Sequence, residues 1–130
     1  MNMYICIAGV LCFILGIVHS ILGEFLIFKN KRNKGSLVPT ISSEGLKERH
    51  LRILWATWHL ASVFGGGIGA ILLKISQDKE ELYTDTTHFI IQSILYAMFF
   101  SSFLVLIGTK AKHPGWVVLL AIGVLLVIGG

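Results

Sequence analysis

Charged residues are scarce in this sequence. Aspartate, glutamate, lysine and arginine together make up 14% of the 130 residues, whereas 55% of the residues are hydrophobic. An ordinary soluble domain carries about 25% charged residues. The composition therefore argues against the soluble globular class and predicts a protein that lies in a lipid bilayer.

The sequence also lacks the short motifs that mark common catalytic and metal sites. It contains no H-E-x-x-H pattern and no cysteine and histidine cluster of the zinc-binding type. Its two cysteines, Cys6 and Cys12, lie apart along one helical segment, so they cannot form a disulfide with each other. The glycine-rich stretch 65–70 continues an apolar segment, which excludes a phosphate-binding loop that follows a strand.

Long apolar segments are what the sequence has in abundance. Four can be identified, at 3–28, 51–75, 88–109 and 114–130, and each approaches the ~20 residues that cross a ~30 Å hydrocarbon core as a helix. We therefore expect an all-α fold: an integral membrane four-helix bundle, in one domain covering 1–130, with both termini on the same side. The last segment reaches only ~25 Å as a helix, so we expect the chain to form a homo-oligomer or to bind a membrane partner.

Basic residues gather in two of the three connections between these segments. The connections 29–50 and 110–113 are rich in lysine and arginine, whereas the one near 77–85 is acidic. Cytoplasmic loops carry the excess of basic residues, so we expect both basic connections in the cytoplasm and both termini outside, in the inner membrane of a bacterium. The net charge of +4 is then a topology signal, and no nucleic-acid partner is expected.

Small residues recur at steps of three and four along the first two segments. This spacing places them on one stripe of each helix, and small residues let helix backbones approach closely in lipid. The same stripes carry His19 and His59, so both imidazoles are expected to face another helix and not the acyl chains. The glycines of this expected packing seam are Gly9, Gly16 and Gly23 on the first helix and Gly66 and Gly69 on the second.

His19 and His59 are the candidate functional residues, because ionisable side chains within a bilayer often mark a site. Each lies ~12 to 14 Å from the cytoplasmic end of its helix, so the two imidazoles are expected to meet at one level. Neutral imidazole is a common ligand for zinc, copper and iron, and a bis-histidine haem takes one histidine from each of two helices. The leading hypothesis is therefore a metal ion or haem b held between the first and second helices.

Glu24 adds a carboxylate about one helical turn nearer the cytoplasm than His19. We expect it to lie near the headgroups and to pair with a basic residue at the start of the second helix. Ser20 precedes it by four positions, the spacing at which side chains hydrogen-bond along a helix. The basic residues considered are Arg49, Arg52 and His50, and the polar side chains expected to support or relay are Glu24 itself, Ser62, Tyr96 and Ser102.

Three alternative hypotheses accompany the ligand-binding one. The histidines can be hydrogen-bonded packing in a structural or accessory subunit, such as an immunity-type protein, that binds no ligand. Alternatively, His19, His59 and Glu24 relay protons or cations in a small ion or solute transporter. The third alternative is a small membrane enzyme with Glu24 and His50 at the cytoplasmic surface. The sequence patterns therefore leave enzymatic activity open.

Overall fold

The structure, a computed structural model, describes residues 1–130 apart from the side chain of Glu80. Within the described chain there is no strand beyond an isolated bridge between Ser43 and Leu46, and the all-α prediction is confirmed. The elements are α1 (Met3–Gly23), the π-helix η1 (Glu24–Phe28), the 3-10 turn η2 (Lys29–Lys31), α2 (Glu48–Gln77), the 3-10 turn η3 (Glu80–Leu82), α3 (Asp85–Gly108) and α4 (Gly115–Gly129).

Three helical stretches are long and apolar enough to cross a membrane: Met3–Lys31, Glu48–Gln77 and Asp85–Gly108. The remaining helix, α4, is shorter. Large apolar side chains are exposed along the helices, for example those of Ile17 and Phe100. Such surfaces are unfavourable in water and are covered by acyl chains in a bilayer, so the structure is consistent with a membrane location.

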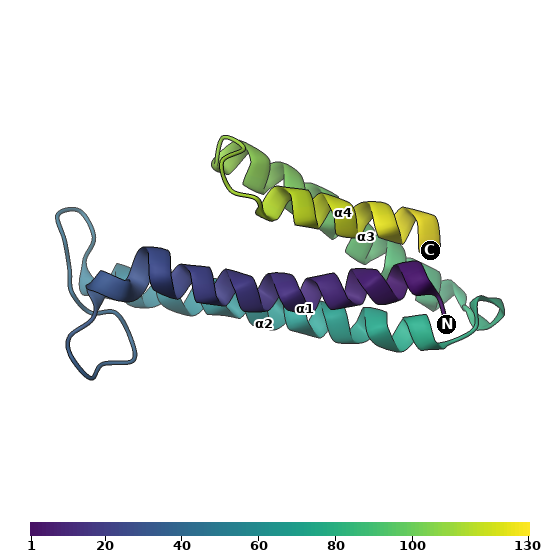
Figure 1. Ribbon diagram of the computed structural model, residues 1–130, viewed down its shortest axis with the longest axis horizontal. Coiled ribbons are helices and arrows are strands. Elements are labelled where there is room, and N and C mark those ends of the chain that lie inside the picture. The colour runs from purple at the N-terminus through teal and green to yellow at the C-terminus, as the bar shows by residue number, and fades with distance from the viewer.

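The helices form two antiparallel hairpins that are joined by the connection through η3. α1 packs along α2, α3 packs along α4, and α4 also packs against α1 (Figure 1). Both termini lie at one end of the molecule, where the Asn2 side-chain amide donates a hydrogen bond to the Gly129 carbonyl oxygen at 2.7 Å. The basic connections that follow α1 and α3 lie toward the opposite end (Figure 1).

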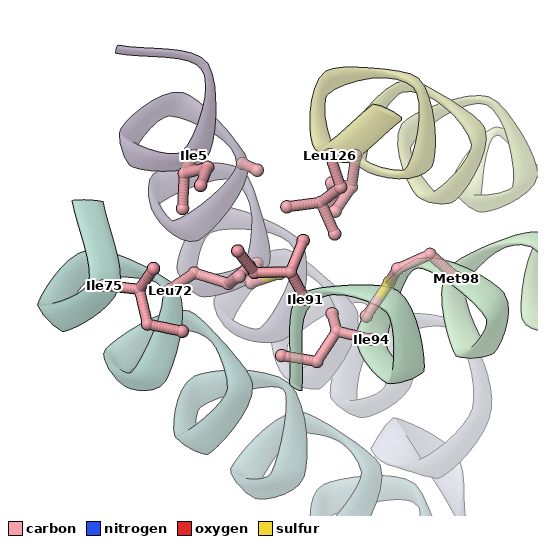
Figure 2. Packing of buried hydrophobic residues seen from close by; sticks show 10 residues of the cluster. Ile5, Leu72, Ile75, Ile91, Ile94, Met98 and Leu126 are labelled. Carbon is pink, nitrogen blue, oxygen red and sulfur yellow. The ribbon is translucent and has the colours of Figure 1, made fainter. Parts of the chain in front are cut away.

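The core lies where the two hairpins meet, at the end that holds the termini. Buried aliphatic side chains from all four helices form one cluster there (Figure 2). Ile5 of α1, Leu72 of α2, Ile91 of α3 and Leu126 of α4 are each at most 2% exposed. Toward the basic end, the α3–α4 hairpin tilts away from α1 and α2 (Figure 1). The two hairpins are therefore held together at one end and diverge at the other.

Glycines set the close contact between α1 and α2. A Cβ atom added at Gly69 would lie 2.9 Å from the Gly9 carbonyl oxygen, and one added at Gly9 would lie 3.0 Å from the Gly69 carbonyl oxygen. Farther along α1, a Cβ atom at Gly16 would lie 3.0 Å from the Ser62 carbonyl oxygen. Small residues at such points allow direct contact between helix backbones, which is a common form of helix packing in lipid.

Candidate functional site

A cluster of polar side chains lies between α1 and α2 near the basic end of the molecule. The Glu24 carboxylate is at its centre: Oε1 accepts hydrogen bonds from the Trp55 indole N–H at 2.7 Å and from His59 Nε2 at 2.8 Å. The other oxygen, Oε2, forms an ion pair with Arg32. His59 Nδ1 in turn lies 3.0 Å from Ser20 Oγ. We call these residues, Ser20, Glu24, Arg32, Trp55 and His59, the Glu24 cluster.

Helix periodicity explains how these residues converge. Ser20 and Glu24 are one turn apart along the first helical stretch, and Trp55 and His59 are one turn apart on α2, so each helix presents two members on one face. Glu24 is the first residue of the π-helix η1, and Arg32 directly follows η2. Because this stretch departs from α-helical geometry, the chain brings the Arg32 guanidinium to the carboxylate. π-turns within α-helices are frequent at functional sites.

Both ring nitrogens of His59 have side-chain partners. The Glu24 carboxylate, paired with Arg32, can only accept hydrogen bonds, so the proton between it and Nε2 belongs to His59. A neutral imidazole then presents the lone pair of Nδ1 to the Ser20 hydroxyl. The Trp55 ring packs edge-on against the imidazole, with centroids 4.9 Å apart. Coordination of a metal ion by His59 therefore requires one of its two hydrogen bonds to break.

His19 has different neighbours from His59. Its ring stacks on the Trp58 indole, with centroids 4.3 Å apart and planes 6° apart. Trp58 also donates its indole N–H to the His19 carbonyl oxygen at 2.8 Å, and the absence of a side chain at Gly23 leaves space for the indole. The expectation that the two imidazoles contact each other is therefore corrected. Successive helix residues point about 100° apart, so Trp58 and not His59 meets His19.

A cavity of about 430 Å³ lies between the two hairpins and includes His19 but not His59. Its lining is mostly apolar and comes from all four helices. His19 and Trp58 contribute from the α1–α2 side, and His113, in the connection before α4, contributes from the α3–α4 side. The other polar residues that line the cavity are Ser62, Ser101 and Thr109.

The polar groups of this cavity differ in their hydrogen bonding. His113 Nδ1 accepts a hydrogen bond from the Gly115 N–H at 3.0 Å, so a neutral ring carries its proton on Nε2. The hydroxyl of Ser62 is buried and has no hydrogen-bond partner among the described residues. The ring nitrogens of His19 also make no hydrogen bond within the described part of the chain. These three side chains are therefore available to a ligand.

A separate groove of about 340 Å³ is lined by residues of α1 and α2 alone. Ser20 and His59, both members of the Glu24 cluster, lie in it together with apolar side chains. Gly16 and Ser62 line both the groove and the cavity, so the contact between α1 and α2 separates the two. The structure thus places His19 and His59 in different concave surfaces.

The remaining predicted residues do not reach the Glu24 cluster. Tyr96 is 58% exposed on α3. Ser102 is buried and donates its hydroxyl to the Trp116 carbonyl oxygen at 2.8 Å, which joins α3 to α4. Gly66 lies near the Phe13 ring and lines the groove. Among the described residues, no group of three or more histidine, cysteine, aspartate and glutamate side chains is placed to hold a metal ion.

The ion-pair partner of Glu24 also differs from the expected one. Arg52 pairs with Glu48, one turn earlier on α2, at 2.8 Å. Arg49 and His50 are exposed at the start of α2. Arg32 pairs with the carboxylate instead, because the helical stretch that carries Glu24 continues through η1 and η2. The expectation of a partner at the start of α2 is therefore wrong.

The sequence patterns did not predict three neighbours of these sites: Arg32, Trp58 and His113. Arg32 is one of several basic residues in its connection, and His113 lies at the end of the basic connection 110–113. A signal for Trp58 was present, since a tryptophan in an apolar segment needs an acceptor for its indole N–H. The indole can reach a carbonyl oxygen of the neighbouring helix only where no side chain stands in its way. Gly23 leaves this space beside the His19 carbonyl oxygen.

Comparison of this chain with protein-family models, with curated proteins and with solved structures gives no match.

Proposed function

We propose that this chain is an integral membrane protein, a four-helix bundle with both termini outside and the connections 29–50 and 110–113 in the cytoplasm. Support comes from the three helices long enough to cross a membrane and from the termini, which share one end. The basic connections lie toward the other end, as the excess of lysine and arginine in cytoplasmic loops requires. In this orientation the Glu24 cluster lies in the cytoplasmic half of the membrane.

Within the bilayer, the protein binds an apolar ligand in the cavity between its two hairpins. The observation that carries this proposal is the cavity itself, whose volume of about 430 Å³ falls within the range of small-molecule sites, roughly 300–1,000 Å³. Sites of this kind have an apolar lining with a few polar groups that orient the ligand. Here His19 and His113 are such groups, and they face the cavity from different hairpins.

The polar groups indicate a ligand with hydrogen-bond acceptors. A neutral His113 offers its Nε2–H as a donor, and the Ser62 hydroxyl has no partner among the described residues. Carbonyl oxygens accept from both kinds of donor. A membrane quinone combines such oxygens with a flat apolar body that partitions into lipid. We therefore take a quinone-type ring as the ligand class.

Tryptophan fluorescence tests this function, because Trp58 lines the cavity. The full chain in lipid nanodiscs is titrated with a short-chain quinone, and we expect saturable quenching that is weakened at least tenfold in apparent affinity by His113→Leu. Tyr96→Phe is the matched control, since Tyr96 is exposed on α3 and does not line the cavity. Quenching that does not saturate, or that is the same in His113→Leu, would reject the proposal.

Haem b or a metal ion bound by His19 is the second candidate. It is favoured by the ring nitrogens of His19, which make no hydrogen bond within the described chain and are free to coordinate. Lys110 and Lys112 lie in the connection between Thr109 and His113, both of which line the cavity, and their charges suit haem propionates. His59 takes no part in this version of the site.

An absorption spectrum and elemental analysis of the purified protein test the second candidate. Haem binding predicts a Soret band that is lost in His19→Ala and kept in His59→Ala. If elemental analysis finds one equivalent of a metal and the spectrum has no Soret band, the site binds a metal ion and not haem. A protein that contains no metal and shows no Soret shift when haem is added rejects both forms.

A further inference from the structure

The Glu24 cluster has the composition and connectivity of a nucleophilic catalytic site. We propose that Ser20, His59 and Glu24 form a serine–histidine–glutamate triad that cleaves acyl esters of membrane lipids. In such triads a histidine removes the serine proton, and a carboxylate orients the histidine. The distances here are 3.0 Å from Ser20 Oγ to His59 Nδ1 and 2.8 Å from His59 Nε2 to Glu24 Oε1. Both lie within the roughly 2.6–3.2 Å needed for proton transfer.

The carboxylate is held so that it selects one tautomer of His59. Trp55 and Arg32 donate to Glu24 from two sides, which fixes its orientation and keeps it an acceptor. The proton of a neutral His59 therefore lies on Nε2, and Nδ1 is left as the base that faces Ser20. In the serine proteases Nε2 faces the serine and Nδ1 faces the carboxylate, whereas here Nδ1 faces Ser20 and Nε2 faces Glu24. The order serine, histidine, carboxylate is the same.

Ser20 differs in its partner from the helical hydroxyls that bond to their own helix. Serine and threonine side chains within helices commonly donate to a carbonyl oxygen of their own helix. Thr57, Ser76, Ser93 and Thr109 do so here. The hydroxyl of Ser20 instead reaches across the helix interface to His59. Its proton is therefore directed at a base and not at the backbone.

The groove that contains Ser20 and His59 indicates the substrate class. Its volume is about 340 Å³, and only α1 and α2 line it, on a face that a bilayer covers with acyl chains. The apolar side chains at its edge are exposed, 59% for Ile17 and 68% for Val63. A substrate that enters from the lipid phase and carries an ester carbonyl next to an apolar chain fits this groove. Ser62 also lines this groove, and its hydroxyl is buried without a partner among the described residues.

The reaction uses water and no redox partner. Ser20 Oγ forms a bond to the ester carbonyl carbon while its proton passes to His59 Nδ1. The carbon–oxygen bond to the alcohol then breaks, and His59 returns the proton to that leaving oxygen. Water next attacks the acyl-serine, giving one proton to His59, which passes it to Ser20 Oγ as the acyl–oxygen bond breaks. The products are a fatty acid and an alcohol.

This activity does not depend on the ligand proposed above. Neither His19 nor His113 belongs to the triad, and neither lines its groove. A protein that binds neither quinone nor haem can therefore still cleave esters at Ser20. A protein that cleaves no ester can still bind a ligand in the cavity.

An alkyl fluorophosphonate, which forms a covalent bond only with activated serines, is the probe. The full chain in phospholipid vesicles is treated with a long-chain fluorophosphonate, and peptide mass spectrometry locates the adduct. We expect one adduct, on Ser20. Vesicles of the same preparation that have not been treated with the probe are expected to release free fatty acid from a radiolabelled phosphatidyl ester. Ser20→Ala abolishes both signals. Ser93→Ala, at a hydroxyl bonded to its own helix, leaves them unchanged.

Variants of the two partners separate catalysis from packing. His59→Gln removes the base and is expected to slow labelling by about 100-fold or more. Glu24 is a positioning residue, so its test compares two substitutions. Glu24→Gln keeps the shape but loses the charged acceptor and slows labelling, whereas Glu24→Asp keeps a carboxylate and restores part of the rate. A packing role predicts the opposite order, since glutamine fills the space of glutamate better than aspartate does.

Three results would each overturn the triad. One is the absence of any adduct on Ser20 in the wild-type protein, a measurement that needs no variant to fold. Another is a labelling rate that His59→Gln leaves unchanged. The last is labelling of Ser20 without release of fatty acid above the Ser20→Ala background.

Discussion

The indole of Trp58 lies flat on the imidazole of His19, with ring centroids 4.3 Å apart, and donates its N–H to the carbonyl oxygen of the same histidine at 2.8 Å. One residue of α2 thus contacts both the side chain and the backbone of one residue of α1. The contact lies beside Gly23, where a side chain would collide with the indole. It forms the α1–α2 side of the cavity and holds His19 in place there.

Trp58→Phe tests the polar part of this contact. The phenyl ring keeps most of the stacking but cannot donate to His19, so we expect a loss of about 0.6–1.7 kcal/mol of stability, the range for hydrogen bonds between membrane helices. Trp116→Phe is the control, since its indole N–H makes no hydrogen bond within the described chain. Denaturant unfolding in detergent micelles measures both variants. Equal losses would show that ring size and not the hydrogen bond matters.

Two neighbouring glycines of α2 make a matched pair for the helix contact. A Cβ atom at Gly69 would lie 2.9 Å from the Gly9 carbonyl oxygen, whereas one at Gly67 meets nothing within 4 Å. Gly69→Ala should therefore destabilise the fold by about 1–3 kcal/mol, the usual cost of overpacking. Gly67→Ala should leave stability unchanged or raise it by up to about 1 kcal/mol, because alanine favours helix. Thermal unfolding of both variants checks this, and the reverse order would contradict the close contact.

Two glutamates that each pair with an arginine give a second comparison. Glu24 accepts from Arg32, Trp55 and His59, while Glu48 pairs with Arg52 across one turn, where both side chains are 53% exposed. We expect Glu24→Gln to cost about 1–3 kcal/mol, because several hydrogen bonds to a charged group are lost. Glu48→Gln should cost less than about 0.5 kcal/mol. If denaturant unfolding gives the two variants similar stabilities, the Glu24 cluster does not hold α1 to α2.

Membrane orientation is tested with single cysteines in a Cys6→Ser, Cys12→Ala background. We expect a membrane-impermeant maleimide to label Ser42→Cys, in the first basic connection, only from the cytoplasmic side. It should label Glu81→Cys, in the acidic connection, only from outside. Labelling of intact cells against inverted vesicles measures both. The opposite pattern would reverse the topology, and labelling of both positions from one side would exclude a membrane crossing by α2.

The helices themselves were predictable from the sequence, because an apolar run of sufficient length has few alternatives. A chain in lipid must satisfy every backbone hydrogen bond internally, so each run forms a helix. The spacing of Gly9, Gly16 and Gly23 likewise follows from helix periodicity and indicated the side of α1 that packs on α2. The convergence of Ser20 and Glu24 on His59 was only partly predictable. The two lie one turn apart, but His59 bonds to both.

The tertiary structure alone decided the partners of the polar side chains. The number of residues between each histidine and the cytoplasmic end of its helix predicted that His19 and His59 lie at one level. The rotation of α2 about its axis, however, turns Trp58 toward His19 and His59 toward Glu24. Likewise, the irregular stretch after α1 gave Glu24 its arginine. Periodicity determines which residues share a face of one helix. How two helices rotate and where a hairpin tilts depend on packing between segments distant in sequence, and those contacts place the cavity and the triad.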